Sequence, residues 1–62
     1  MYNQLLYERL NDKFGPFNML LISEGIAEMY RILADDKLNK EAGFEYIWWQ
    51  EAHKRTAEEV NK

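Results

Sequence analysis

His53 is the one histidine of the chain and the first residue to consider for acid–base catalysis or metal binding. A carboxylate-bridged metal site in a helical bundle uses Glu-x-x-His pairs on several helices. Here Gln50 stands three residues before His53, while Glu51 stands two residues before it and so lies on a different helix face. We therefore predict a solvated surface histidine, no metal site and no cofactor. A metal- or ligand-binding bundle that uses His53 and Glu51 is a weaker alternative.

Hydroxyl side chains give no sign of nucleophilic catalysis. Ser23 and Thr56 both fall inside predicted helices, away from a nucleophile elbow or a recognisable base. The three glycines are isolated, so they form no phosphate-binding loop. The sequence predicts no catalytic residue, no small-molecule substrate and no enzyme activity.

Two basic clusters, Lys37 with Lys40 and Lys54 with Arg55, raise the possibility of nucleic-acid binding. Three helices of this size can form a helix-turn-helix unit, so a small DNA-associated regulatory protein is the alternative function. Four glutamates on the same predicted third helix oppose it, because phosphates would repel them. The net charge of −3 also argues against a nucleic-acid partner. These glutamates are Glu45, Glu51, Glu58 and Glu59.

Sixty-two residues predict a single helical domain, residues 1–62. A chain of this size buries only about 60% of its unfolded surface and folds with little margin. The sequence has no cysteine, so no disulfide can stabilise the fold. Its content of hydrophobic residues, 47%, is high enough for the fold to be stabilised by close helix packing or by oligomerisation instead. No segment approaches the roughly 20 apolar residues of a membrane span. The N-terminus lacks the basic start and apolar core of a signal peptide, which favours a cytoplasmic protein without membrane contact.

The first predicted helix covers about residues 2–14. An apolar stripe at i+4 spacing lies on one face, and Leu5 lies outside the stripe, where we expect it to be exposed. Gly15 and Pro16 then end the helix, because glycine accepts a left-handed conformation and proline cannot continue the same helix. The stripe consists of Tyr2, Leu6, Leu10 and Phe14.

The second predicted helix, about 17–35, is apolar almost all round. Its charges collect on one narrow strip, and a helix of this kind is normally buried on several sides. Two neighbouring helices of the same short chain would hardly cover it. Gly25 costs about 1 kcal/mol relative to alanine in a helix interior, so we expect it to let a neighbouring helix approach closely. The charged strip is Glu24, Glu28, Arg31 and Asp35.

The third predicted helix covers about residues 37–60. Its start is left open between Asp36 and the neighbourhood of Gly43, with the earlier start preferred because Leu38 and Ala42 extend an apolar stripe. The predicted fold is therefore all-α with three helices: an antiparallel hairpin with a long third helix packed across it, completed by oligomerisation.

The aromatic run at residues 44–49 must lie on two faces of this helix, since adjacent helical residues point about 100° apart. Trp48 belongs with Phe44 and Ile47, and Trp49 belongs with a longer stripe of small residues. One face can pack on its own chain; the other needs something to cover it. Three interpretations remain open: one broad intramolecular core, a symmetric homodimer or higher oligomer, or a site for a different protein or a small ligand. Which tryptophan faces the interface is also open.

The sequence thus predicts a small protein that acts by protein–protein association, as a homo-oligomer or as an adaptor or inhibitor of another protein. Aromatic side chains dominate binding energy where an interface buries them, so the run supplies the expected anchors. The predicted interface is Phe44, Tyr46, Ile47, Trp48, Trp49, Ala52, Thr56 and Val60.

Overall fold

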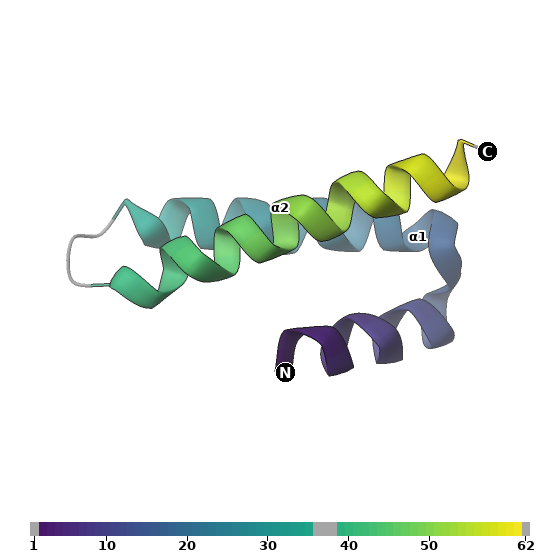
Figure 1. The fold of residues 1–62 in the computed structure, drawn as a ribbon, viewed down its shortest axis with the longest axis horizontal. Helices are drawn as coiled ribbons and strands as arrows, with labels where there is room; N and C mark the ends of the chain where they lie inside the picture. Colours follow the sequence, from purple (N-terminus) through teal and green to yellow (C-terminus); the bar gives the residue numbers. More distant parts are fainter. Residues whose placement is uncertain (1, 36–38, 62) are drawn as a thin grey trace.

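The computed structural model describes residues 2–35 and 39–61. In that part of the chain there are two helices, α1 (Tyr2–Ala34) and α2 (Lys40–Val60), which form a helical hairpin (Figure 1). The all-α prediction is confirmed. The predicted three-helix fold is wrong: the break expected at residues 15–16 is present as a non-helical kink at Gly15, but the segments on its two sides belong to one element, α1.

The bend lies at Gly15, where φ is 84° and ψ is 161°. This combination of positive φ and extended ψ is accessible almost only to glycine. Pro16 reinforces it, since proline disfavours the α conformation in the residue before it and has no N–H of its own to donate. Nδ2 of Asn18 donates to the carbonyl oxygen of Phe14 at 2.8 Å, which gives one carbonyl at the bend a partner. The Gly-Pro pair therefore divides α1 into an N-terminal arm, residues 2–14, and a C-terminal arm, residues 16–34.

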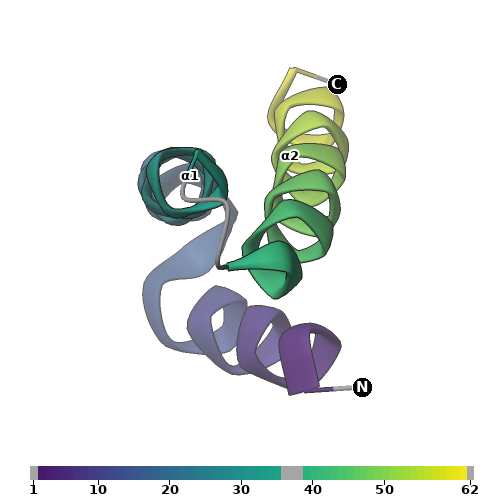
Figure 2. The ribbon, with the colours of Figure 1, turned by 90° about the vertical axis from the view of Figure 1, so that its left-hand side faces the viewer.

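The N-terminal arm folds back along the hairpin, so that both arms and α2 surround one core (Figures 1 and 2). Two side-chain contacts tie this arm to α2. The Tyr7 hydroxyl is hydrogen-bonded to Oγ1 of Thr56, and Nδ2 of Asn3 donates to Oε2 of Glu45. Leu5 is 54% exposed, as its place outside the stripe predicted.

The core is small and is centred on Trp49 and Met19, both fully buried. Ala27 and Ala52 complete the buried cluster, and half-buried side chains from all three helical segments pack around it. These surrounding residues are Leu6, Tyr7, Leu10, Ile22, Ile26, Tyr30, Tyr46 and Trp48.

The start of α2 lies between the two predicted positions. The helix begins at Lys40, with Asn39 at the N-cap position but without a side-chain capping hydrogen bond. The earlier predicted start at residues 36–37 lies outside the described residues. Gly43 is an interior residue of α2 and does not mark its beginning.

Sequence analysis expected Gly25 to let a neighbouring helix approach closely, but no helix in the described part of the chain does so. Gly25 lies on the exposed side of α1, and a Cβ atom added to it would meet nothing within 4 Å. Gly43 in α2 is equally open. Both glycines therefore weaken their helices, and no close packing contact among the described residues compensates for this.

This difference between the glycines gives a direct test of the bend. We expect Gly15→Ala to lower the free energy of unfolding by roughly 1–3 kcal/mol, because alanine is strained at that φ and ψ. Gly43→Ala is the matched control and should raise it by roughly 0.5–1 kcal/mol, because its backbone is helical. Urea denaturation followed by circular dichroism, at one protein concentration, measures both. Equal effects of the two substitutions would contradict the bend.

Candidate interaction surface

The aromatic run at residues 44–49 is divided between the core and the surface. Trp49 is fully buried, whereas Phe44 is 77% and Ile47 is 58% exposed. The helical repeat accounts for this division, because Phe44 and Ile47 are three residues apart and share a side of α2 that Trp49 does not. The Trp49 face of α2 therefore packs on its own chain.

The residues of the predicted interface fall into three groups. A partner that docks on the folded chain can reach the exposed group, but not the buried one. The interface itself stays a prediction. Trp49, Ala52 and Thr56 are buried; Tyr46, Trp48 and Val60 are half-buried; Phe44 and Ile47 are exposed.

Tyr7 of the N-terminal arm closes the core over both tryptophans. Its ring centroid lies 6.2 Å from that of Trp48, edge to face, and 6.3 Å from that of Trp49. The two indoles also meet edge to face, with centroids 5.0 Å apart. Such geometries are favourable beyond the area that they bury. Nε1 of Trp49 is buried and has no hydrogen-bond partner among the described residues.

The threonine hydroxyl group beside the core is hydrogen-bonded to a backbone carbonyl group. Oγ1 of Thr56 donates to the carbonyl oxygen of Ala52 at 2.9 Å. Since a threonine hydroxyl has one hydrogen, Tyr7 must donate to Thr56 in the contact that they share. Breaking that contact would leave a half-buried phenol without its partner.

His53 is not the solvated histidine that the sequence predicted. It is half-buried, and its Nδ1 lies 3.0 Å from Oγ of Ser23 across the hairpin. The Ser23 hydroxyl is fully buried and donates to the carbonyl oxygen of Met19 at 2.7 Å, so His53 is the donor between the two side chains. Sequence reasoning missed this serine–histidine contact because residues 23 and 53 meet only through the hairpin register. A buried hydroxyl that is already paired is a structural link between α1 and α2.

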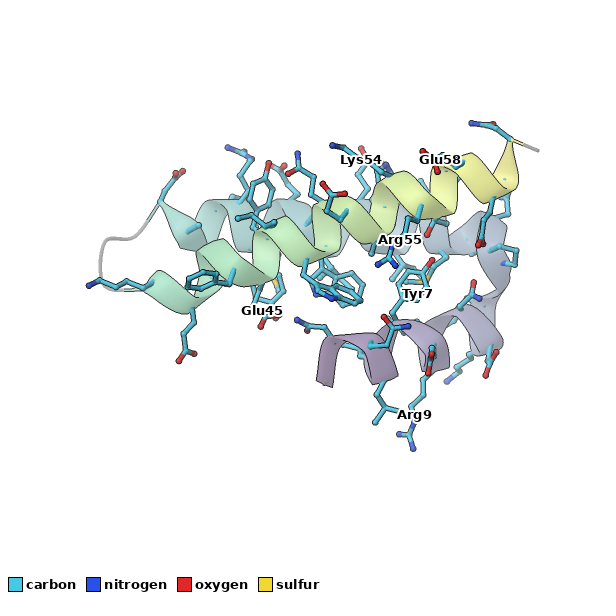
Figure 3. All side chains as sticks on the ribbon, viewed as in Figure 1. Tyr7, Arg9, Glu45, Lys54, Arg55 and Glu58 are labelled. Carbon is cyan, nitrogen blue, oxygen red and sulfur yellow. The ribbon has the colours of Figure 1, made fainter. Side chains whose placement is uncertain are left out.

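The basic residues of α2 lie in two environments. Lys54 is exposed and forms an ion pair with Glu51 at 3.7 Å, three residues earlier on the same helix. Figure 3 shows Lys54 pointing away from the N-terminal arm and Arg55 pointing toward Tyr7. Arg55 and Glu59 line an open polar cleft of about 220 Å³ with residues of the N-terminal arm. Lys40 is exposed, and Lys37 lies outside the described residues.

The remaining site classes find no support in the described part of the chain. No group of three or more histidine, cysteine, aspartate or glutamate side chains there could hold a metal ion. None of the described helices has the length and apolar character needed to cross a membrane. No protein-family model, curated protein or solved structure matches the chain. The prediction that the protein is not an enzyme therefore stays a prediction.

Large apolar side chains remain on the outside of both helices. On α2 they are Phe44 and Ile47. On the C-terminal arm of α1 they follow one row at four-residue spacing, which we call the α1 ridge. Sequence analysis expected that one chain could hardly cover this helix, but it placed the interface residues on the last helix and none of them in this row. The α1 ridge comprises Phe17, Leu21, Gly25, Met29 and Leu33, all exposed.

The division of the aromatic run predicts unequal effects of two alanine substitutions. Trp49→Ala should cost about 3–5 kcal/mol of unfolding free energy, because it removes the largest fully buried side chain. Phe44→Ala should change it by less than about 0.5 kcal/mol, because Phe44 is mostly exposed. Urea denaturation of dilute protein measures both values. Comparable losses from both substitutions would contradict the assignment of Trp49 to the core and Phe44 to the surface.

Proposed function

We propose that this protein acts by non-enzymatic association with a second copy of itself, through apolar side chains that one chain leaves exposed. The observation that carries the proposal is the extent of that surface. Among the described residues, nine large hydrophobic side chains are between 40% and 77% exposed. Large exposed apolar patches mark interaction sites in proteins.

The accessible surface of the whole chain supports the same proposal. It measures 4856 Å², whereas a folded monomer of 7.5 kDa is expected to expose about 4,200 Å². The elongated shape, 38 × 20 × 14 Å, accounts for the larger value. The excess of roughly 600 Å² is close to the roughly 800 Å² that each partner covers in an interface of standard size. Pairing of two chains would bring the exposed area per chain back to an ordinary value.

A second copy is favoured over an adaptor or inhibitor role toward another protein by the stability of so small a chain. Its described core has five buried hydrophobic residues, of which three are alanines: Met19, Ala27, Ala42, Trp49 and Ala52. Chains of this length commonly gain stability from oligomerisation. A homo-oligomer supplies that stability without a second kind of protein, to an extent that rises with the concentration of the chain.

The proposal predicts the mass of the protein in solution. Light scattering coupled to size-exclusion chromatography, at tens to hundreds of micromolar protein, should give about twice the mass of one chain, because an interface of standard size is stable there. Dilution should lower both the mass and the apparent thermal stability, since association and folding are linked.

A single-chain mass that persists over this whole range, with unfolding independent of concentration, would overturn self-association. Docking on another protein would then be the remaining form of the association hypothesis.

A further inference from the structure

We propose that the second copy docks on the α1 ridge, with the two α1 helices antiparallel and crossing at Gly25. This inference rests on the proposed self-association and specifies the surface that carries it. It is argued from the order of residues along the ridge, the space around Gly25 and the extent of the surface.

The α1 ridge is symmetric about Gly25. Leu21 and Met29 stand four residues to either side, and Phe17 and Leu33 stand eight residues to either side. Their side chains are 70% (Phe17), 69% (Leu21), 47% (Met29) and 40% (Leu33) exposed. A two-fold axis at Gly25 would place Leu21 of one copy level with the partner's Met29, and Phe17 level with the partner's Leu33. This is the self-complementary arrangement that a closed two-fold interface requires.

Rows of residues four apart are also the surface feature by which helices most often pack. Such rows interlock when two helices cross at about −50°, the commonest crossing class in globular proteins. The small residue of the row stands at its centre, where the two backbones approach most closely. Ile32, 59% exposed, borders the row and extends its apolar surface toward the end of α1.

No contact within the described part of one chain requires a glycine at position 25. Gly25 lies in the helical interior of α1, and a Cβ atom there would meet nothing within 4 Å. Glycine in such a position weakens a helix by comparison with alanine. At a helix crossing the same residue removes the side chain that would hold the two backbones apart. The crossing therefore explains a glycine that the single chain does not.

The exposed pair on α2 fits a second copy less well. Phe44 and Ile47 span one helical turn, and Lys54 and Glu51 form an ion pair on the neighbouring surface. The α1 ridge extends over 16 residues, or about 24 Å of helix. The negative charge of Glu28, the residue before Met29, is partly neutralised, because Nε of Arg31 donates to Oε2 of Glu28 at 3.1 Å. That hydrogen bond holds the pKa of Glu28 below its usual value.

Sedimentation equilibrium of the full chain and three variants tests the inference. Leu21→Glu places a charge on the ridge and should weaken dimerisation at least about tenfold, because interfaces depend on a few central apolar anchors. Phe44→Glu, the matched control on α2, should leave the dimerisation constant within about twofold, since additions of charge outside an interface matter little.

In the third variant, Gly25→Ala, a loss of dimerisation cannot be caused by unfolding of the monomer. Alanine favours the helix, so the variant monomer must stay folded, yet its methyl group obstructs the crossing. We expect tighter folding at high dilution together with dimerisation weakened about tenfold, a combination that a purely structural glycine would not give.

The outcomes separate the two levels of proposal. A wild-type chain that stays monomeric overturns both self-association and the ridge. A wild-type dimer that Phe44→Glu dissociates, while Leu21→Glu and Gly25→Ala leave it intact, overturns the ridge and leaves self-association standing. A dimer lost in the two α1 variants and retained in the α2 control supports both.

Discussion

The fold depends on the backbone conformation of Gly15. Only because this residue adopts a positive φ can the N-terminal arm fold back and place Tyr7 over the two tryptophans. Without that arm, a hairpin of the C-terminal arm and α2 would leave one side of Trp49 open to water. Pro16 disfavours the helical conformation at the preceding residue, which agrees with the extended ψ of Gly15, while the positive φ depends on the glycine itself.

The bend also decides which apolar side chains stay outside. The N-terminal arm and α2 both contact the C-terminal arm of α1, and the three segments together enclose one core. Buried polar contacts fix their register, since Ser23 meets His53 across the hairpin and Tyr7 meets Thr56 across the fold. No segment of the described residues 2–35 and 39–61 covers the apolar ridge on the outer side of α1, and this is the surface on which we propose that a second copy docks.

Sequence patterns predicted the local features well and the tertiary ones poorly. The break at residues 15–16, the exposure of Leu5 and the turn of Trp49 away from Phe44 follow from backbone preferences and helical periodicity. The helix count was wrong because the Gly-Pro break bends α1 without ending it. The predicted surroundings of Gly25 and His53 also differ from those in the structure, because both depend on which helix lies opposite the residue. Periodicity gives the faces of a helix but does not identify what covers each one.

Disulfide trapping tests the central claim, antiparallel pairing on the α1 ridge, most directly. The chain has no cysteine of its own, so Leu21→Cys and Met29→Cys each introduce a unique thiol. Their sulfurs can join only where the two Cα atoms lie about 4.4–6.8 Å apart. When the two variants are mixed and oxidised, mass spectrometry should find the mixed dimer well above its statistical share, because residue 21 lies level with residue 29 of the partner. Preferential joining of each variant to itself would contradict the antiparallel crossing at Gly25.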